Sequence, residues 1–222
     1  MSFDLLPETL AELPLFPLHQ AVLFPGMLMP LHVFEPRYRA MIADALNTDN
    51  LIGVVMLQEG ADPMAAQAPI HPVACAGRIV HDEKLDNGRY NILVHGIDRV
   101  RLNAELPLTP GGYRRFDISP FGPPSPDCVA AAQSELVRLQ SCILSLRSAI
   151  GQRDQQLVEV LSSTADPLAL ADILSAVMVN EPHDRQALLE LGDLKRRLGM
   201  LIDLLAEAMI HVGEPPVQAK LN

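Results

Sequence analysis

The chain of 222 residues is 49% apolar and lacks tryptophan, so it is long and hydrophobic enough to bury a core built mainly from aliphatic side chains. Its formal net charge of −10 leaves no basic domain, which argues against a protein that binds nucleic acid. Three cysteines without Cys-x-x-Cys spacing (Cys75, Cys128 and Cys142) indicate neither a disulfide framework nor a zinc site, and they favour a reducing, cytoplasmic location.

The amino-terminal part of the chain contains a long uncharged run. The chain starts with MSFDLLPETLAEL, which is acidic where a secretory signal would be basic, so we expect no export signal. Residues 13–34 then carry no formal charge, and a run of this length could cross a bilayer. Four prolines interrupt the run, however, and each proline in a helix interior costs on the order of 3 kcal/mol. We therefore expect short extended segments of a soluble core and no membrane partner.

The first half of the chain shows short apolar or alternating segments separated by turn signals. The expected strands are residues 13–18, 51–57, 73–84, 89–94 and 113–119. The sequence Asp86-Asn87-Gly88 is typical of a hairpin turn, and Gly96 is expected at a bulge or bend. Many short strands with turns between them predict an antiparallel barrel or sandwich.

One helix is expected inside this half, at the stretch PLHVFEPRYRAM. We expect Phe34 to be the last buried strand residue and Pro36 to open the helix, because proline suits the first helical position. An amphipathic stripe follows to residue 46. Four polar side chains crowd this junction, and they could form either an active site or the seam between strand and helix: Glu35, Arg37, Tyr38 and Arg39.

The second half of the chain is expected to be helical. Residues 121–127, FGPPSPD, have the composition of a linker. Helical spacing then recurs in residues 127–150, 155–161, 166–179 and 184–191, and from residue 193 onward. Asp127 and Asp166 are the expected N-caps of two of these helices. The predicted organisation has three parts: a strand-rich part at residues 1–122, a helical part at 123–212 and a frayed tail at 213–222.

A search for catalytic motifs finds none. The sequence has no G-x-x-x-x-G-K-[ST] phosphate loop, no G-x-S-x-G elbow and no H-E-x-x-H metal motif. A Ser–Lys dyad needs a buried lysine, and the sequence places Lys84, Lys195 and Lys220 in polar surroundings. We therefore expect a protein that is not an enzyme and that needs no metal or cofactor.

Several segments together resemble a known family. LPLFPL, FPG, PLHVFEPRYRAM and CAGRIV…DNGRYNILVHGIDRVRL are similar, in order and spacing, to the amino-terminal substrate-binding domain of the Lon proteases, and residues 166–198 resemble the helical part that follows in that family. The resemblance covers roughly residues 12–210. Its signature residues, which we expect to be structural, are Pro14, Pro17, Pro25, Gly26, Glu35, Pro36, Arg37, Tyr38, Gly88, Arg89, Gly96 and Arg99.

The resemblance implies an α+β fold: a twisted antiparallel β-barrel of the pseudouridine-synthase-associated (PUA-like) type with one internal helix, then a helical bundle. It also implies a role, because this region of Lon engages unfolded or tagged polypeptides, while the ATPase and the Ser–Lys peptidase lie further along the protease chain. Neither module is present in this sequence, which therefore resembles the stand-alone Lon-domain proteins of bacteria.

The leading hypothesis is a non-enzymatic module that binds unfolded or extended polypeptides or acts as an adaptor for a partner protein. The alternative is binding of RNA or a small ligand through the PUA-like barrel, which the net charge disfavours. The oligomeric state stays open. A barrel can offer apolar grooves and strand edges to an extended chain. The candidate linings for such a groove are Phe16, Phe24, Met27, Met29 and Phe34.

Overall fold

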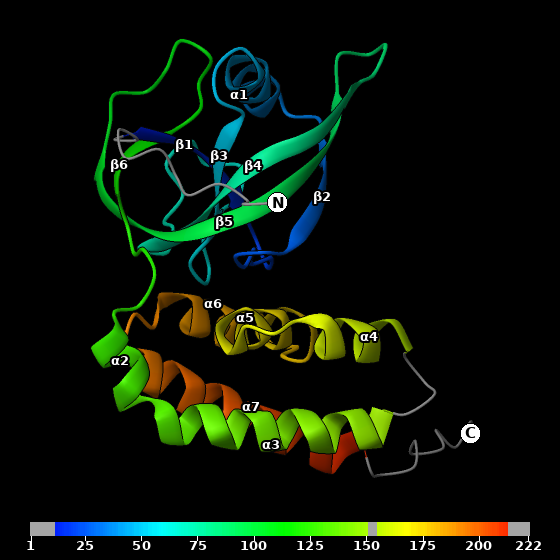
Figure 1. Cartoon of the computed structure of the whole chain (residues 1–222). Coiled ribbons are helices and arrows are strands. Elements are labelled where there is room, and N and C mark those ends of the chain that lie inside the picture. Colours follow the sequence, from blue (N-terminus) through cyan, green and yellow to red (C-terminus); the bar gives the residue numbers. More distant parts are fainter. Residues whose placement is uncertain (1–11, 151–154, 213–222) are drawn as a thin grey trace, which may run out of the picture.

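In Figure 1 the strands, together with the first helix, form an upper layer, and the later helices form a lower layer. The structure is a computed structural model that describes residues 12–150 and 155–212. The expected tail at residues 213–222 lies outside the described residues. The strands are β1 (Glu12–Leu18), β2 (Leu28–Val33), β3 (Leu51–Met56), β4 (Val73–Lys84), β5 (Tyr90–Glu105) and β6 (Arg115–Pro120).

The six strands form one mixed sheet in the order β2-β5-β4-β3-β1-β6, and an additional β5–β6 pairing closes β1, β3, β4, β5 and β6 into a ring. The expectation of wholly antiparallel pairing is wrong for one pair, because β1 and β3 run parallel, with Leu15 opposite Gly53. The chain between them passes through β2 and helix α1 (Pro36–Leu46), and such a crossover returns the next strand in the same direction.

The long β4–β5 hairpin forms the expected turn and bend. Gly88 has a φ of 75°, which the turn requires and which a residue without Cβ adopts without strain. At the bend, Gly26 N donates to Gly96 O and Gly96 N donates to Met27 O, each at 2.9 Å. A Cβ on Gly96 would lie 2.2 Å from Phe24 O, so this close approach of two backbones requires glycine.

The junction between β2 and α1 differs from expectation at one residue. Val33 is the last buried residue of β2, and Phe34 is 58% exposed, so the expectation that Phe34 is buried is wrong. Side chains alternate between the two faces of a strand, and the face that Val33 shares points inward. Pro36 opens α1 as expected, and the inward stripe of α1 consists of Tyr38, Met41, Ile42 and Ala45.

The helical layer contains α2 (Pro126–Ala131), α3 (Gln133–Ile150), α4 (Gln155–Ser163), α5 (Pro167–Val177), α6 (Pro182–Glu190) and α7 (Leu194–Val212). The single long helix expected from Asp127 is instead two helices that meet at Ala132. The expectation that Asp127 is the N-cap is wrong, because Pro126 occupies the first helical position and Ser125 caps the helix, with its Oγ accepting from Cys128 N at 3.3 Å. Asp166 caps α5 as expected and accepts from Leu168 N at 3.0 Å.

The buried apolar side chains form two clusters, and one of them joins the two layers. The smaller one lies among the ring strands and contains Leu13, Leu15, Leu51, Val55, Ala74, Ala76, Val100, Phe116 and Ile118. The larger one is shared, since it joins residues of β2, β4, β5 and α1 to residues of α3, α5, α6 and α7. The division into residues 1–122 and 123–212 stays a prediction, because both parts contribute to this one shared core.

Candidate functional site

The five candidate linings separate into two groups in the structure. Phe24 is completely buried and Phe16 is 7% exposed. Phe16 stacks on Tyr38 with 4.6 Å between the ring centroids, so it helps to hold α1 on the sheet. These two phenylalanines belong to the core and do not reach the surface of this structure.

The other three candidates lie along β2 with one neighbour that the sequence reasoning missed. Phe34 and Leu28 are 58% and 55% exposed, while Met27 and Met29 are partly buried against the shared core. The alternation of side chains along residues 28–33 could have identified Leu28. Leu28 and Val33 point to opposite faces of the strand, and Val33 is buried, so Leu28 is exposed. We name Met27, Leu28, Met29 and Phe34 together the β2 surface.

The backbone of β2 also faces outward along one side. Within the described residues β2 pairs only with β5, so it is an edge strand. Gly96 N donates to Met27 O, and antiparallel pairs alternate, so every second residue from Met27 bonds to β5. The polar backbone groups that point away from β5 therefore belong to Leu28, Pro30 and His32. Pro30 has no N–H, which limits uncontrolled pairing at this edge.

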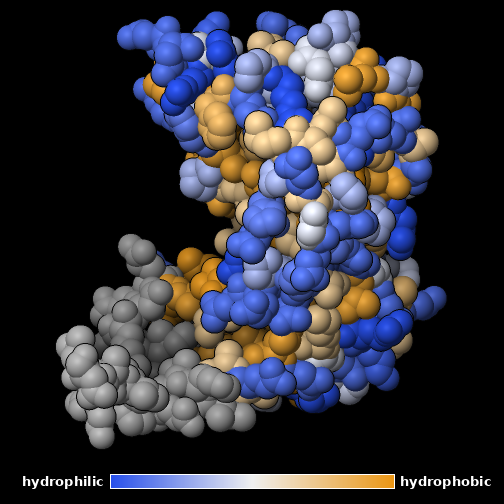
Figure 2. Space-filling view, turned by 180° about the vertical axis from the view of Figure 1, so that it is seen from behind, coloured by the Kyte–Doolittle hydropathy of each residue, from blue (hydrophilic) through white to orange (hydrophobic). Residues whose placement is uncertain are grey.

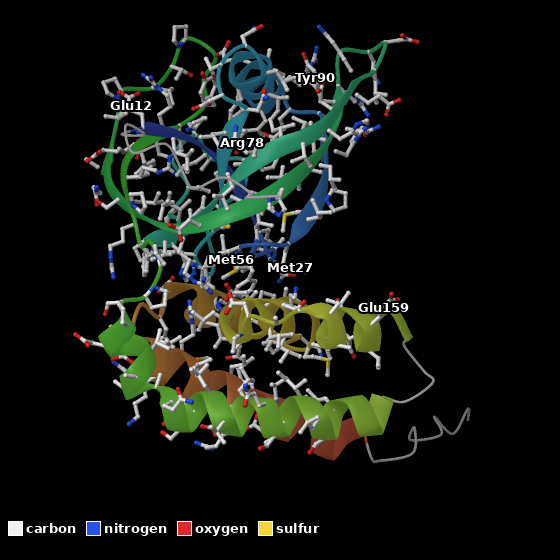
Figure 3. The ribbon with its side chains drawn as sticks, viewed as in Figure 1. Glu12, Met27, Met56, Arg78, Tyr90 and Glu159 are labelled. Carbon is white, nitrogen blue, oxygen red and sulfur yellow. The ribbon has the colours of Figure 1, made fainter. Side chains whose placement is uncertain are left out.

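The surface next to β2 is hollowed. From behind, a hollow opens between the sheet layer and the helical layer, and hydrophobic residues gather on both of its sides (Figure 2). Met27 lies at the end of the sheet that faces α5 (Figure 3). The β2 surface thus combines exposed apolar side chains, an open strand edge and a nearby concavity, which together suit an extended chain.

Three polar residues of PLHVFEPRYRAM, namely Glu35, Arg37 and Tyr38, form a clamp at the start of α1. The Arg37 guanidinium donates to Glu35 Oε2 at 3.0 Å, to Pro63 O at 3.0 Å and to Ala65 O at 3.3 Å. It also lies 4.6 Å from the centroid of the Tyr38 ring. Burial raises the pKa of the Tyr38 phenol, which favours its neutral form. These contacts fasten the segment between β3 and β4 to α1.

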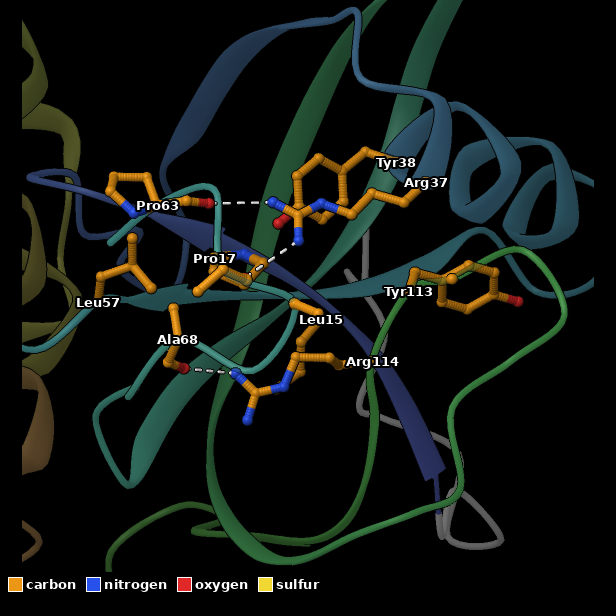
Figure 4. Close-up of a pocket in the computed structure, with 12 residues that line it drawn as sticks. Leu15, Pro17, Arg37, Tyr38, Leu57, Pro63, Ala68, Tyr113 and Arg114 are labelled. Atoms are coloured by element: carbon orange, nitrogen blue, oxygen red, sulfur yellow. Dashed lines mark hydrogen bonds between the residues drawn. The ribbon is translucent and has the colours of Figure 1, made fainter. Parts of the chain in front are cut away.

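A second arginine fastens the same segment from the opposite side. Arg114 donates to Ala68 O at 2.7 Å and pairs with both carboxylate oxygens of Glu105, at 2.7 and 2.9 Å. The two arginines border a pocket that also contains Leu57 (Figure 4). Its volume is about 10 Å³, which admits one water molecule and no organic ligand. This pocket therefore offers no room for a substrate, and the contacts of Arg37 and Arg114 there hold the β3–β4 segment in place.

Arg99, another signature residue, joins the two layers. Its Nη1 donates to Asp172 Oδ2 at 3.0 Å, its Nη2 donates to Asp172 Oδ1, and its Nε donates to Leu189 O at 3.2 Å. Arg99 is 5% exposed and Asp172 is 7% exposed, so the ion pair is removed from water. The sequence reasoning did not identify Asp172, because no local pattern connects residues that lie 73 positions apart.

Other titratable groups surround this ion pair. Burial, and then the neighbouring Arg99 charge, lower the pKa of Arg197 to about 10. Burial raises the pKa of the Asp98 carboxyl and raises that of the Cys75 thiol well above its usual value. Gln186 Nε2 donates to Val73 O at 3.0 Å and adds a further hydrogen bond between the layers. This polar network is enclosed, so its visible role is to position the helices against the sheet.

The remaining signature residues lie in strands and turns. Pro14 and Pro17 belong to β1, and Pro25-Gly26 forms the turn before β2, with a Gly26 φ of 77°. In the β4–β5 turn, Arg89 N donates to Asn87 Oδ1 at 3.0 Å. Among residues 12–150 and 155–212, no group of His, Cys, Asp or Glu is arranged to hold a metal ion. In the same part of the chain, no helix combines the length and the hydrophobicity that a bilayer crossing demands.

Solved structures with this arrangement include amino-terminal domains of Lon proteases. The N-terminal domain of a Mycobacterium avium complex Lon protease has a TM-score of 0.68 at 18% identity, covering 88% of this chain and 98% of that one. A Lon N-terminal domain protein from Xanthomonas campestris has a TM-score of 0.60 at 23% identity, covering 87% and 98% of the two chains. The fold is therefore that of a Lon amino-terminal domain.

Sequence comparison identifies the family. The family model of the ATP-dependent protease La (Lon) substrate-binding domain matches residues 12–207, so the chain belongs to this family. It is 30% identical over 194 residues to Lon protease 2 of Myxococcus xanthus, covering 87% of this chain and 23% of that protein. It is 28% identical over 197 residues to Escherichia coli Lon protease, covering 87% and 24%. The chain thus spans about a quarter of the length of these relatives, and the matched domain is a non-catalytic, substrate-recognition module.

Proposed function

We propose that this protein binds unfolded or extended polypeptide segments at the β2 surface. The observation that carries the proposal is an edge strand that begins at the exposed Leu28 and is followed by the exposed Phe34, in a member of a substrate-binding family. Large apolar side chains at an open edge are costly to leave in water, and an extended peptide can cover them. The free cysteines Cys75, Cys128 and Cys142 fit a cytoplasmic setting for this function.

The β2 surface offers two kinds of contact to an extended chain. The outward carbonyl groups of Leu28, Pro30 and His32 can accept backbone hydrogen bonds from an added strand. Because Pro30 offers no donor, the added strand forms an incomplete ladder, and the apolar contacts contribute the larger share of the binding free energy. Dissociation constants of tens of micromolar are therefore expected, and the binding should tolerate many apolar sequences.

The experiment is a titration of a fluorescently labelled, extended apolar peptide with the purified chain, followed by anisotropy. The double variant Leu28→Asp with Phe34→Asp should weaken binding at least about 5-fold, because it places carboxylates on the apolar contact. The matched control changes two exposed apolar residues of α3, Val137→Asp with Leu144→Asp, and should bind as the wild type does. Equal loss in both variants, or no binding by the wild type, would contradict the proposal.

A pull-down with the purified protein can distinguish general polypeptide recognition from an adaptor role. Capture of many misfolded proteins from a native cytosolic extract would indicate general recognition, whereas one stable partner would indicate an adaptor. In both cases the module acts by binding and not by catalysis. The net charge of −10 opposes binding of RNA, so we expect none. Tight, salt-sensitive binding of RNA in the same anisotropy assay would therefore contradict the proposal.

A further inference from the structure

A second surface lies near the end of β2, and it is cationic where the β2 surface is apolar. A groove of about 320 Å³ lies between one face of α1 and the β4–β5 hairpin, bordered by Pro36, Arg39, Ala40, Ala43, Lys84, Gly88 and Tyr90. Small residues form most of its α1 wall, and Tyr90 lies beside α1 in Figure 3. Its charged side chains, Arg39 and Lys84, are both cationic, in a chain whose net charge is −10.

Neither cation of the groove is neutralised within the described residues, where ion pairs engage other arginines and lysines. Lys84 Nζ lies 5.7 Å from the centroid of the Tyr90 ring. The nearby carboxylates of Glu83 and Asp44 hydrogen-bond to neutral groups, to Asn91 at 2.8 Å and to the Tyr113 hydroxyl at 2.7 Å, and not to Arg39 or Lys84. These two cations can therefore each pair with a carboxylate from outside the protein.

The position of Arg39 is fixed by the hairpin. A Cβ on Gly88 would lie 2.2 Å from Arg39 Nη2, so the guanidinium rests directly on the glycine backbone. Arg39 Nε is buried and has no hydrogen-bond partner. At the start of α1 the carboxylate of the N-cap residue Glu35 pairs with Arg37, so it does not neutralise Arg39.

The groove begins where β2 ends. Val33 of β2 pairs with Tyr90, and Tyr90 pairs with Lys84, so one cross-strand row leads from β2 into the groove. The groove thus lies at the end of the sheet toward which β2 runs, and a polypeptide bound along β2 can continue past Phe34 toward the two cations. From this continuity we propose that the groove binds a carboxylate of the polypeptide, so that the protein prefers extended apolar segments followed by acidic residues. This inference rests on the proposed function of the β2 surface.

The test compares two labelled peptides that share one extended apolar sequence, one of them followed by two glutamates and the other by two glutamines. The wild type should bind the acidic peptide about 3- to 10-fold more tightly at low salt, and about 0.5 M NaCl should remove this preference because it screens exposed charges. The double variant Arg39→Gln with Lys84→Gln should bind both peptides equally. Lys84→Gln alone, at an exposed hairpin position, should lose part of the preference without loss of thermal stability.

A matched control removes two other exposed cations, Lys195→Gln with Arg196→Gln on α7, and should keep the preference. Equal binding of both peptides by the wild type would overturn the groove assignment while leaving the proposed function intact. Binding of neither peptide would instead contradict the proposed function. Low-micromolar binding of inorganic phosphate that the double variant abolishes would overturn the peptide carboxylate in favour of a small free anion.

Discussion

Two junctions in this protein use arginine in different ways. At the junction between sheet and helices, Arg99 is buried and its charge is matched by the carboxylate of Asp172. At the junction between β2 and α1, Arg37 is partly exposed and donates two hydrogen bonds to the backbone carbonyls of Pro63 and Ala65. The junction at Arg99 depends on an ion pair that is buried away from water. The junction at Arg37 depends on hydrogen bonds that water can partly replace.

The difference teaches which junction is more sensitive to the loss of one partner. A buried carboxylate that loses its arginine has no water to solvate it, whereas a backbone carbonyl near the surface regains a hydrogen bond from solvent. The attachment of the helices to the sheet is therefore expected to depend more strongly on a single residue than the attachment of the β3–β4 segment to α1.

The largest effect is expected at Arg99. The substitution Arg99→Ala should lower the free energy of unfolding by about 3–5 kcal/mol, because it leaves Asp172 charged, buried and unpaired. The double variant Arg99→Met with Asp172→Leu should recover most of this loss, since it removes both charges and keeps apolar volume. Urea denaturation measures both values. If the double variant were as unstable as Arg99→Ala, the comparison between the two junctions would fail.

A smaller effect is expected at Arg37. The substitution Arg37→Ala removes its bonds to Glu35, Pro63 and Ala65 and should cost about 1–3 kcal/mol of stability, with a melting temperature lower by several degrees. Glu35→Gln should cost less than 1 kcal/mol, because an amide oxygen can still accept from Arg37. Thermal melting followed by circular dichroism checks both. Wild-type melting temperatures in both variants would contradict the clamp.

The smallest effect concerns pH and the Tyr113 hydroxyl, which donates to Asp44 Oδ2 at 2.7 Å beside α1. Burial, and then this hydrogen bond, raise the pKa of Tyr113 from 10.0 to about 12. The folded pKa lies above the unfolded one, so the stabilisation is complete below about pH 10 and is lost as the pH rises through about 12. The stability difference between the wild type and Tyr113→Phe should therefore shrink between those pH values. A constant difference in melts from pH 8 to 12 would contradict this assignment.

Local sequence signals predicted much of the fold but less of the candidate site. Pro36 and Asp166 act within a few residues of their own positions, so their roles in starting helices could be predicted. The burial of Phe24 and the exposure of Phe34 could not, since hydrophobicity alone does not say which face of a segment meets the core. The predicted binding residues thus divided between core and surface, and Leu28 was missed.

The sequence by itself determined the order of strands and helices along the chain, the β4–β5 turn, the Asp166 cap and the family, because these depend on the backbone preferences of neighbouring residues and on short motifs. Only the tertiary structure decided that β1 and β3 pair in parallel, that Arg99 meets Asp172, and that Arg39 and Lys84 meet at one groove. Each of these depends on segments that are far apart in the chain, and their meeting is fixed by packing around the shared core and not by any local pattern.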